Sequence, residues 1–242
     1  MSRKLLALGL VAMIWVSLAA VSWAGQSAPA VGRLPATVDP SNFVAVVDNP
    51  YYPLPPGRTL VHKGVRDGLS QTDRVTVTNR TKVIQGVTTT VVRDVARHGI
   101  RLLEKTTDWY AQDVDGNVWY FGEDTKTYNA KGQVASTEGS WQAGVDGAVP
   151  GIIMEANPQP SDGYRQEFYK GHAEDQAWIL SRGGSISVPY GRVHRVLRTM
   201  EWTPLEPGVI DQKYYAPGLG IVLEVAVAGR NEFSRLVRVE GA

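Results

Sequence analysis

From Arg58 onward the chain alternates apolar and polar residues with a period of two, and short turns separate the alternating runs. The most regular run is 219–228, in which Leu219, Ile221, Leu223, Val225 and Val227 would share one apolar face. Turn residues such as those of 115–117 (Asp-Gly-Asn) lie between the runs. Connections this short leave no room for crossover helices. The sequence therefore predicts an all-β protein, built as a single curved antiparallel sheet or an incomplete β-barrel.

Two stretches interrupt this pattern. Residues 173–181 are the nearest candidate for a helix, whereas 191–202 alternates well enough to form a strand. Residues 139–163 contain five glycines and three prolines and have no strand period. Loops longer than about 12–15 residues are uncommon in compact domains and often act as lids or binding loops. We expect one long Gly/Pro-rich loop here, covering the sheet.

The N-terminus has the pattern of a secretory signal peptide. Arg3 and Lys4 precede the apolar run 5–21, and Ser22-Trp23-Ala24 places small residues at the −3 and −1 positions of a cleavage site. An uncleaved anchor is the alternative, because about 18 apolar residues can span a bilayer. We expect a signal peptide over 1–24, a flexible lead-in over 25–42 and a single β-rich domain over 43–242. The protein would then be extracytoplasmic, in the periplasm or secreted.

Composition excludes several classes of function. Without Arg3 and Lys4 the chain has 23 basic and 24 acidic residues, so its near-neutral charge gives no reason to expect nucleic acid or anionic lipid as partner. The chain has no cysteine. Thiolate metal sites and thiol nucleophiles are excluded, and the acylated cysteine of a bacterial lipoprotein is absent, so we expect no disulfides and no stable membrane anchor after cleavage.

Oxygen ligands alternate through the turn at 113–117. Asp113, Asp115 and Asn117, with Glu123 or Asp124 downstream, could bind calcium. An EF-hand has its glycine at the sixth position and flanking helices, whereas here the glycine is fourth and the flanks are aromatic strands. A β-hairpin turn without metal is the favoured interpretation, with calcium as the possible cofactor.

Aromatic residues crowd the same hairpin. One face of the two strands would fill the core, and the other could form a platform for an apolar ligand or a sugar. A polar cluster at 164–169 could orient such a ligand, although an exposed face with cross-strand ion pairs is the simpler explanation. The candidate ligand-binding residues are Trp109, Trp119, Phe121, Trp141, Tyr164, Arg165 and Tyr169.

No motif identifies an enzyme. The four histidines are scattered, and the chain lacks a G-x-S-x-G elbow, a phosphate-binding glycine loop and a dinucleotide fingerprint. We therefore expect a binding or carrier protein that holds an apolar or amphipathic small molecule in a concave sheet. The alternative is a glycan-acting enzyme that uses a carboxylate pair beside the aromatic platform, with Glu138, Glu167 and Glu174 as candidates.

The chain resembles a group of uncharacterised exported bacterial proteins. The resemblance rests on DWYAQD at 108–113, GNVWYFGE at 116–123, EGSW at 138–141, YRQE at 164–167, EWTPL at 201–205 and KYYAPGLG at 213–220. It implies export but no activity, because none is associated with the group. The run YYAPGLGIV is also similar, over a shorter stretch, to the last strands of curved half-barrel envelope proteins such as lipoprotein carriers.

Overall fold

The computed structural model describes residues 34–241, and strands account for nearly all of its regular structure. No α-helix occurs in this range, where the only helical element is the 3₁₀ turn η1 (Pro40–Asn42). The strands are β1 (Phe43–Val44), β2 (Thr59–Arg66), β3 (Leu69–Ile84), β4 (Val87–His98), β5 (Arg101–Asp113), β6 (Val118–Tyr128), β7 (Val134–Ser136), β8 (Trp141–Gln142), β9 (Val149–Met154), β10 (Gly163–Arg165), β11 (Glu167–Phe168), β12 (Gln176–Arg182), β13 (Ser185–Val188), β14 (Gly191–His194), β15 (Leu197–Trp202), β16 (Ile210–Ala216), β17 (Gly220–Ala228) and β18 (Phe233–Glu240).

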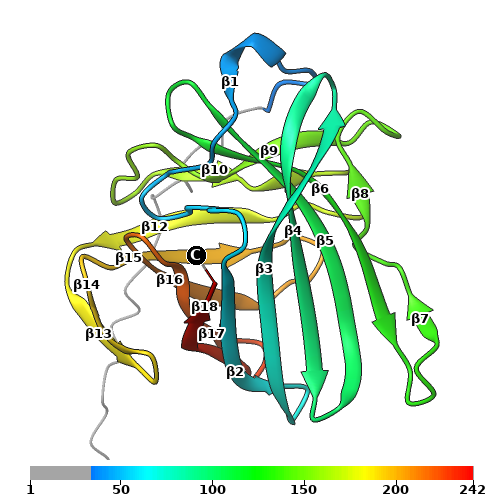
Figure 1. The fold of residues 1–242 in the computed structure, drawn as a ribbon, viewed down its shortest axis with the longest axis vertical. Helices are drawn as coiled ribbons and strands as arrows, with labels where there is room; N and C mark the ends of the chain where they lie inside the picture. The colour runs from blue at the N-terminus through cyan, green and yellow to red at the C-terminus, as the bar shows by residue number, and fades with distance from the viewer. Residues whose placement is uncertain (1–33, 242) are drawn as a thin grey trace, which may run out of the picture.

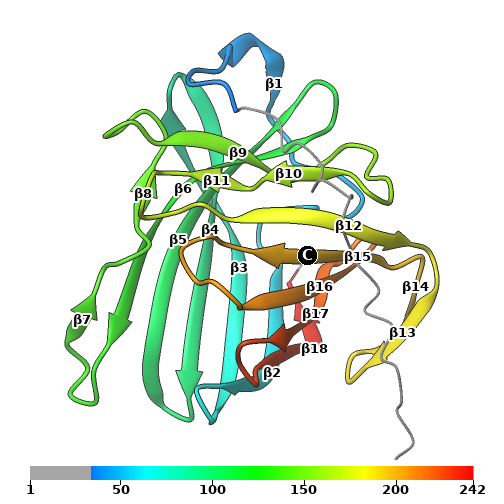
Figure 2. The same ribbon diagram turned by 180° about the vertical axis from the view of Figure 1, so that it is seen from behind.

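Sixteen of these strands form one antiparallel sheet, whose main path runs β10-β12-β15-β16-β17-β18-β2-β3-β4-β5-β6-β9-β11. Five long strands, β2 to β6, stand along one side, and β12 and β15 to β17 cross behind them (Figures 1 and 2). The sheet therefore curves through a large angle and surrounds an interior. The expected fold class, a curved antiparallel sheet in the form of an incomplete barrel, is confirmed.

The two ends of this path meet at Gln166. β10 pairs with β12 and β11 pairs with β9, and Gln166 is the single residue between β10 and β11. One short extended segment thus pairs with both edges of the sheet. Between those edges there is one seam at which the ladder of backbone hydrogen bonds is not continuous. We call this segment, residues 163–168, the seam segment. It nearly closes the barrel.

The segment 139–163, expected as one loop, contains β8 and β9, and its end enters β10. β9 pairs with β6 on one side and β11 on the other, so it is part of the wall. Its glycine has a packing reason: a Cβ on Gly151 would lie 2.4 Å from the carbonyl carbon of Gln166. The lack of side-chain periodicity here reflects this close backbone approach and not the absence of a strand.

The helical candidate at 173–181 is likewise a strand over most of its length, β12, whereas the alternating stretch 191–202 forms β14 and β15. A small second sheet, β13 with β14, packs Val188 and Val193 against Leu236 and Val222. None of the helical structure described in 34–241 is long and apolar enough to span a bilayer. The predicted signal peptide and lead-in up to residue 33 lie outside the described residues.

Candidate functional site

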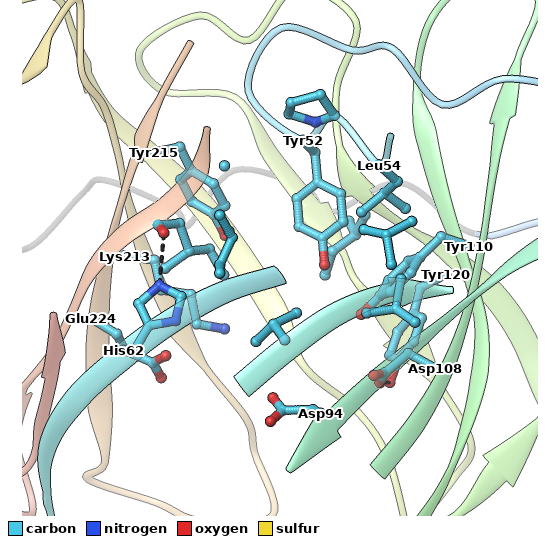
Figure 3. A pocket seen from close by; sticks show the side chains of 18 of the residues that line it. Tyr52, Leu54, His62, Asp94, Asp108, Tyr110, Tyr120, Lys213, Tyr215 and Glu224 are labelled. Carbon is cyan, nitrogen blue, oxygen red and sulfur yellow. Dashed lines mark hydrogen bonds between the residues drawn. The ribbon is translucent and has the colours of Figure 1, made fainter. Parts of the chain in front are cut away.

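The barrel encloses a cavity of about 300 Å³ that draws its lining from both sides of the curved sheet. Tyr110, Tyr120 and Asp108 face it from the long strands, and Lys213, Tyr215 and Glu224 face it from the crossing strands (Figure 3). A second hollow of about 260 Å³ shares Asp73, Asp94 and Glu224 with this cavity. We call the first cavity the lumen.

Strand register places a carboxylate on each of four neighbouring strands. Asp108 on β5 lies directly opposite Glu123 on β6 and Val92 on β4. On β4, Asp94 comes two residues after Val92 and therefore shares its face. Asp94 lies opposite Val75 on β3, and Val75 in turn comes two residues after Asp73. Because side chains two residues apart share a face of a strand, the four acids form a diagonal row across the inner wall. We call Asp73, Asp94, Asp108 and Glu123 the acid row.

Three more carboxylates continue the acidic lining around the lumen. Glu167 comes from the seam segment, Asp175 from the chain just before β12, and Glu224 from β17. Asp175 is solvent-exposed while lining the cavity, so it marks an opening. Arg58, His62 and Lys213 are the basic residues among the lining residues. The lumen thus has a clear excess of carboxyl groups.

Burial strongly opposes ionisation of these acids. Burial and the neighbouring Asp73 raise the pKa of Asp94 well above its usual range, and burial together with Asp108 does the same for Glu123. Burial raises the pKa of Asp108 to about 7, although the Tyr120 hydroxyl donates a 2.8 Å hydrogen bond to its carboxylate. Burial and Asp175 raise the pKa of Glu167 to about 8. At neutral pH several carboxyl groups of the lumen therefore retain protons.

Lys213 is paired within the wall. Its Nζ lies 2.8 Å from an oxygen of Glu201, which is 5% exposed. Glu201 also accepts hydrogen bonds from Thr199 (2.7 Å), Tyr215 (3.0 Å) and Gln166 (3.1 Å). Burial alone would raise the pKa of Glu201, but Lys213 and the hydroxyl and amide donors lower it. The pair is an ionised anchor that ties β15 and β16 to the seam segment at Gln166.

The other two basic lining residues are also held by the protein. The Nε2 of the buried His62 lies 3.0 Å from the Ile221 carbonyl, which can only accept, so Nε2 carries the hydrogen (Figure 3). Burial lowers the pKa of His62, which favours the neutral ring. Arg58 donates to the carbonyls of Gly218 and Pro53. Neither side chain forms an ion pair with the acid row in the described structure.

The lumen also has aromatic and aliphatic lining residues. The rings of Tyr110 and Tyr120 stack with centroids 4.8 Å apart, and Tyr52 meets Tyr110 edge-on at 5.2 Å. Tyr52 comes from the proline-rich segment before β2, which lays it beside Leu54 over the lumen (Figure 3). Further apolar lining residues are Leu60, Val75, Val77, Val92, Ile153, Leu219 and Ile221. The lumen is therefore amphipathic, because tyrosines and aliphatic residues line it beside the carboxyl groups.

The structure places the predicted aromatic platform elsewhere. Trp109, Trp119 and Phe121 do not line the lumen; Phe121 is fully buried, and Trp109 is buried with Lys82 over its ring. Trp141 is buried too, and its Nε1 donates to Glu167 over 2.9 Å. The hairpin's other aromatic face, with Tyr110 and Tyr120, lines the lumen. The alternation of residues predicted that the hairpin has two faces, but it did not show which face lines the lumen.

The polar cluster is also not gathered at the lumen. Tyr164 is buried without a partner for its hydroxyl, Arg165 lies over the Phe168 ring, and Tyr169 stacks on His172. None of the three lines the lumen. The residues that sequence reasoning missed, above all Asp94, Asp108 and Lys213, are single charges within strands. The only feature that could have identified them is that they face the inside of the barrel, and the inward face of a strand can be assigned only when the strand register is known.

The candidate catalytic carboxylates are not brought together. Glu167 lines the lumen, but Glu138 is exposed outside it, and Glu174 accepts a hydrogen bond from the Gly171 backbone. Of the three candidates, only Glu167 therefore lines the lumen.

In the turn at 113–117, the side-chain oxygens accept hydrogen bonds from neighbouring N–H groups of the protein. The Asp113 carboxylate accepts from the backbone of Asp115 and Asn117, from the Asn117 amide and from the Trp119 indole, all within 3.1 Å. The Asn117 amide oxygen accepts from the Ala156 backbone. Within 34–241, no group of three or more His, Cys, Asp or Glu side chains is placed to hold a metal ion. The arrangement matches the hairpin interpretation, in which the acid shapes the turn.

No protein-family model matches the chain, and no curated protein matches it in sequence. Two solved structures are similar in fold. One, from Bacteroides fragilis, is described provisionally as an exported protein with a YmcC-like fold; it matches 78% of this chain and 98% of its own, with 14% identity and a TM-score of 0.46. The other, from Parabacteroides distasonis, is described provisionally as a lipoprotein and has the same coverage, 12% identity and a TM-score of 0.41. At these values the similarity identifies neither a ligand nor an activity.

Proposed function

We propose that the protein is an exported carrier that holds a small amphipathic molecule inside the barrel. The observation that carries this proposal is the amphipathic lumen of about 300 Å³, which lies at the lower end of the size range of ligand sites. Tyr52, Tyr110 and the aliphatic residues would contact the apolar part of the ligand, and the acid row its polar part. Export is supported by the N-terminal leader pattern.

The charge of the lining favours a ligand whose polar end is a cation, such as an alkylamine. Asp94 makes no hydrogen bond with a basic side chain among the described residues, and Asp108 is bonded only to the Tyr120 hydroxyl. A cation beside these acids would lower their pKa values and displace the retained protons. A neutral or anionic polar end gains nothing comparable from this lining.

The test uses three fluorescent probes with the same alkyl tail and an amine, an alcohol or a carboxylate at the end. We expect the amine to bind most tightly, the carboxylate most weakly, and amine affinity to rise from about pH 6 to about pH 8 as the acids give up their protons. Native mass spectrometry of freshly purified protein would detect a retained ligand. Equal affinities for the three probes would remove the cationic preference, and no uptake of any probe would remove the carrier function.

Two substitutions separate the parts of the site. Asp94→Asn should weaken the amine about tenfold or more while leaving the alcohol nearly unchanged, because it removes a charge and keeps the shape. Val92→Phe should weaken all three probes by filling the lumen, since Val92 is a buried lining residue. The control is Val83→Phe, because Val83 is 65% exposed on the neighbouring strand and does not line the lumen.

A further inference from the structure

The outer face of the long strands has the opposite charge from the lumen. Residues directly paired across neighbouring strands share a face, so the register defines three rows that run across the outside from β18 toward β6. One row is Arg235, Lys63, Thr72 and Arg97; the next is Arg238, Val61, Arg74, Val95, Lys105 and Lys126; the third is Glu240, Thr59, Thr76, Arg93, Thr107 and Asp124. These rows contain eight basic residues and two acids. We call this surface the basic wall.

The two acids of the basic wall neutralise only part of it. Glu240 pairs with Arg74 at 2.6 Å and with Arg238 at 2.5 Å, and Asp124 pairs with Lys126 at 2.7 Å. The other basic residues are exposed and form no ion pair within the described range; they are Lys63, Arg93, Arg97, Lys105 and Arg235. Five uncompensated cations on one continuous sheet face indicate an anionic partner.

An apolar residue projects from the end of the same wall. Ile100, at the tip of the β4–β5 hairpin, is 97% exposed and lies between the exposed Arg97 and Arg101. The β2–β3 hairpin ends beside it, tied by a 2.7 Å contact between the His98 ring and the Ser70 carbonyl, and it presents Leu69, which is 38% exposed. Both tips lie at the same end of the barrel (Figures 1 and 2). An apolar tip flanked by arginines is suited to the interface of an anionic bilayer, where the side chain enters the headgroup layer and the cations contact the headgroups.

We propose that the basic wall and the Ile100 hairpin dock reversibly on the surface of an anionic lipid bilayer. Charge complementarity supplies the long-range attraction, and Ile100 supplies a contact that a soluble polyanion would not use. This surface lies on the opposite face of the wall from the lumen, so the docking does not depend on the identity of any ligand inside. A soluble anionic polymer as the partner is the outcome to be distinguished by experiment.

The experiment measures flotation of the processed protein with vesicles of phosphatidylcholine alone and with vesicles that also contain phosphatidylglycerol. We expect partitioning at least about tenfold stronger onto the anionic vesicles, and its loss in about 0.5 M salt. Equal partitioning onto both vesicle types, or no binding to either, would overturn the proposal.

Matched variants locate the surface. The triple substitution of Lys63, Arg93 and Lys105 to Gln should reduce anionic partitioning about tenfold or more, because each cation near the surface adds attraction. The control triple replaces the exposed Lys170, Arg192 and Arg195, which lie outside the basic wall, with the same change in net charge. An equal loss in both triples would show a non-specific charge effect and overturn the assignment.

Ile100→Ser tests the bilayer against a soluble polyanion. It should weaken vesicle binding about three- to fivefold without changing binding of polyphosphate, since burying an isoleucine favours the interface alone. Val83→Ser removes an exposed apolar residue away from the tip and should leave vesicle binding unchanged. If Ile100→Ser leaves vesicle binding unchanged while polyphosphate competes fully, the partner is a soluble polyanion and the bilayer proposal fails. Circular dichroism verifies that each variant is folded.

Discussion

The two faces of β2 to β6 carry opposite charges. Inside, Asp73, Asp94, Asp108 and Glu123 line a partly desolvated lumen, while outside basic residues outnumber acids. Burial raises the pKa values of Asp94, Asp108 and Glu123, whereas the basic residues outside are exposed to water. A single strand therefore presents two different chemistries, one on each side of the wall.

Total charge does not reveal this contrast. The formal net charge of the chain is only +1, although seven carboxyl groups line the lumen and the basic wall contains eight basic residues and two acids. A near-zero sum therefore gives no information about how the charges are distributed between the two surfaces.

The largest expected effect is the difference in stability between losing an ion-paired carboxylate inside the wall and losing one on its outer face. Glu201→Ala should destabilise the protein by about 3 kcal/mol, because it removes the buried carboxylate that pairs with the half-buried Lys213 and accepts three further hydrogen bonds. Glu240→Ala also removes the partner of two cations, but on the solvated face, so its unfolding midpoint should stay close to that of the unmodified protein. Urea unfolding measures both.

A second variant separates lost packing from lost charge. Glu201→Leu combined with Lys213→Met replaces the pair by apolar side chains and should recover much of the stability lost in Glu201→Ala. A similar loss in Glu201→Ala and Glu240→Ala would contradict the contrast between the two faces.

The next expected effect is a loss of stability as the pH rises. Asp108 and Glu167 have folded pKa values of about 7 and about 8, above those of the unfolded chain. Their stabilising contribution is complete below about pH 4 and is lost as the pH rises through 7 and 8. Thermal unfolding at pH 5.5 and at pH 9 measures it, the midpoint being lower at pH 9.

Two groups act in the opposite direction at acid pH. Burial lowers the pKa of His62, and Lys213 holds that of Glu201 low, so both lose their contribution as the pH falls. The stability maximum should therefore lie on the mildly acidic side of neutrality. Asp108→Asn combined with Glu167→Gln should flatten the alkaline fall, and an unchanged slope would show that other groups control it.

A smaller effect is expected from the hydroxyl that supports Asp108. Tyr120→Phe removes the 2.8 Å hydrogen bond to the carboxylate, so the pKa of Asp108 should rise further. The cost at pH 8 should be about 1–3 kcal/mol, because the lost bond is to a charged acceptor. NMR titration of the Asp108 carboxyl measures the shift. Tyr128→Phe, on the same strand but outside the lumen, is the matched control.

The smallest effect is expected at the outer turn. The Asp113 oxygens are occupied by four N–H donors, so calcium has no free set of ligands there. The melting temperature in millimolar calcium should match that with chelator to within about 1 °C. A rise of several degrees would restore the calcium interpretation.

The sequence was sufficient to predict the architecture. Period-two alternation and short turns gave the antiparallel, strongly curved all-β fold, and the Asp-Gly-Asn turn lies where β5 meets β6. Each of these features is local, because it depends on neighbouring residues and turn geometry.

The residues that line the lumen could not be predicted, because they depend on the strand register and on the β-bulges that shift it. In β17 the apolar face expected from 219–227 is broken by a register shift at Tyr214/Tyr215 in the β16–β17 ladder. Glu224 consequently lies opposite Lys213 and faces the lumen, while Val227 is 51% exposed. In the same way, the register shift between Asp108 and Tyr110 in the β5–β6 ladder lets Tyr120 and Glu123, three residues apart on β6, both face the lumen. A bulge reverses which residues face inward, and no local composition reveals it.

The pairing of β18 with β2 also restricts when the barrel can form. Glu240 pairs with Thr59 and Phe233 with Val65, so the ladder joins the beginning of the barrel to its end. While residues 233–240 have not yet been synthesised, β2 lacks this neighbour and the wall stays open. The order in which the chain emerges, more than the stability of any single strand, therefore sets the moment at which the interior closes.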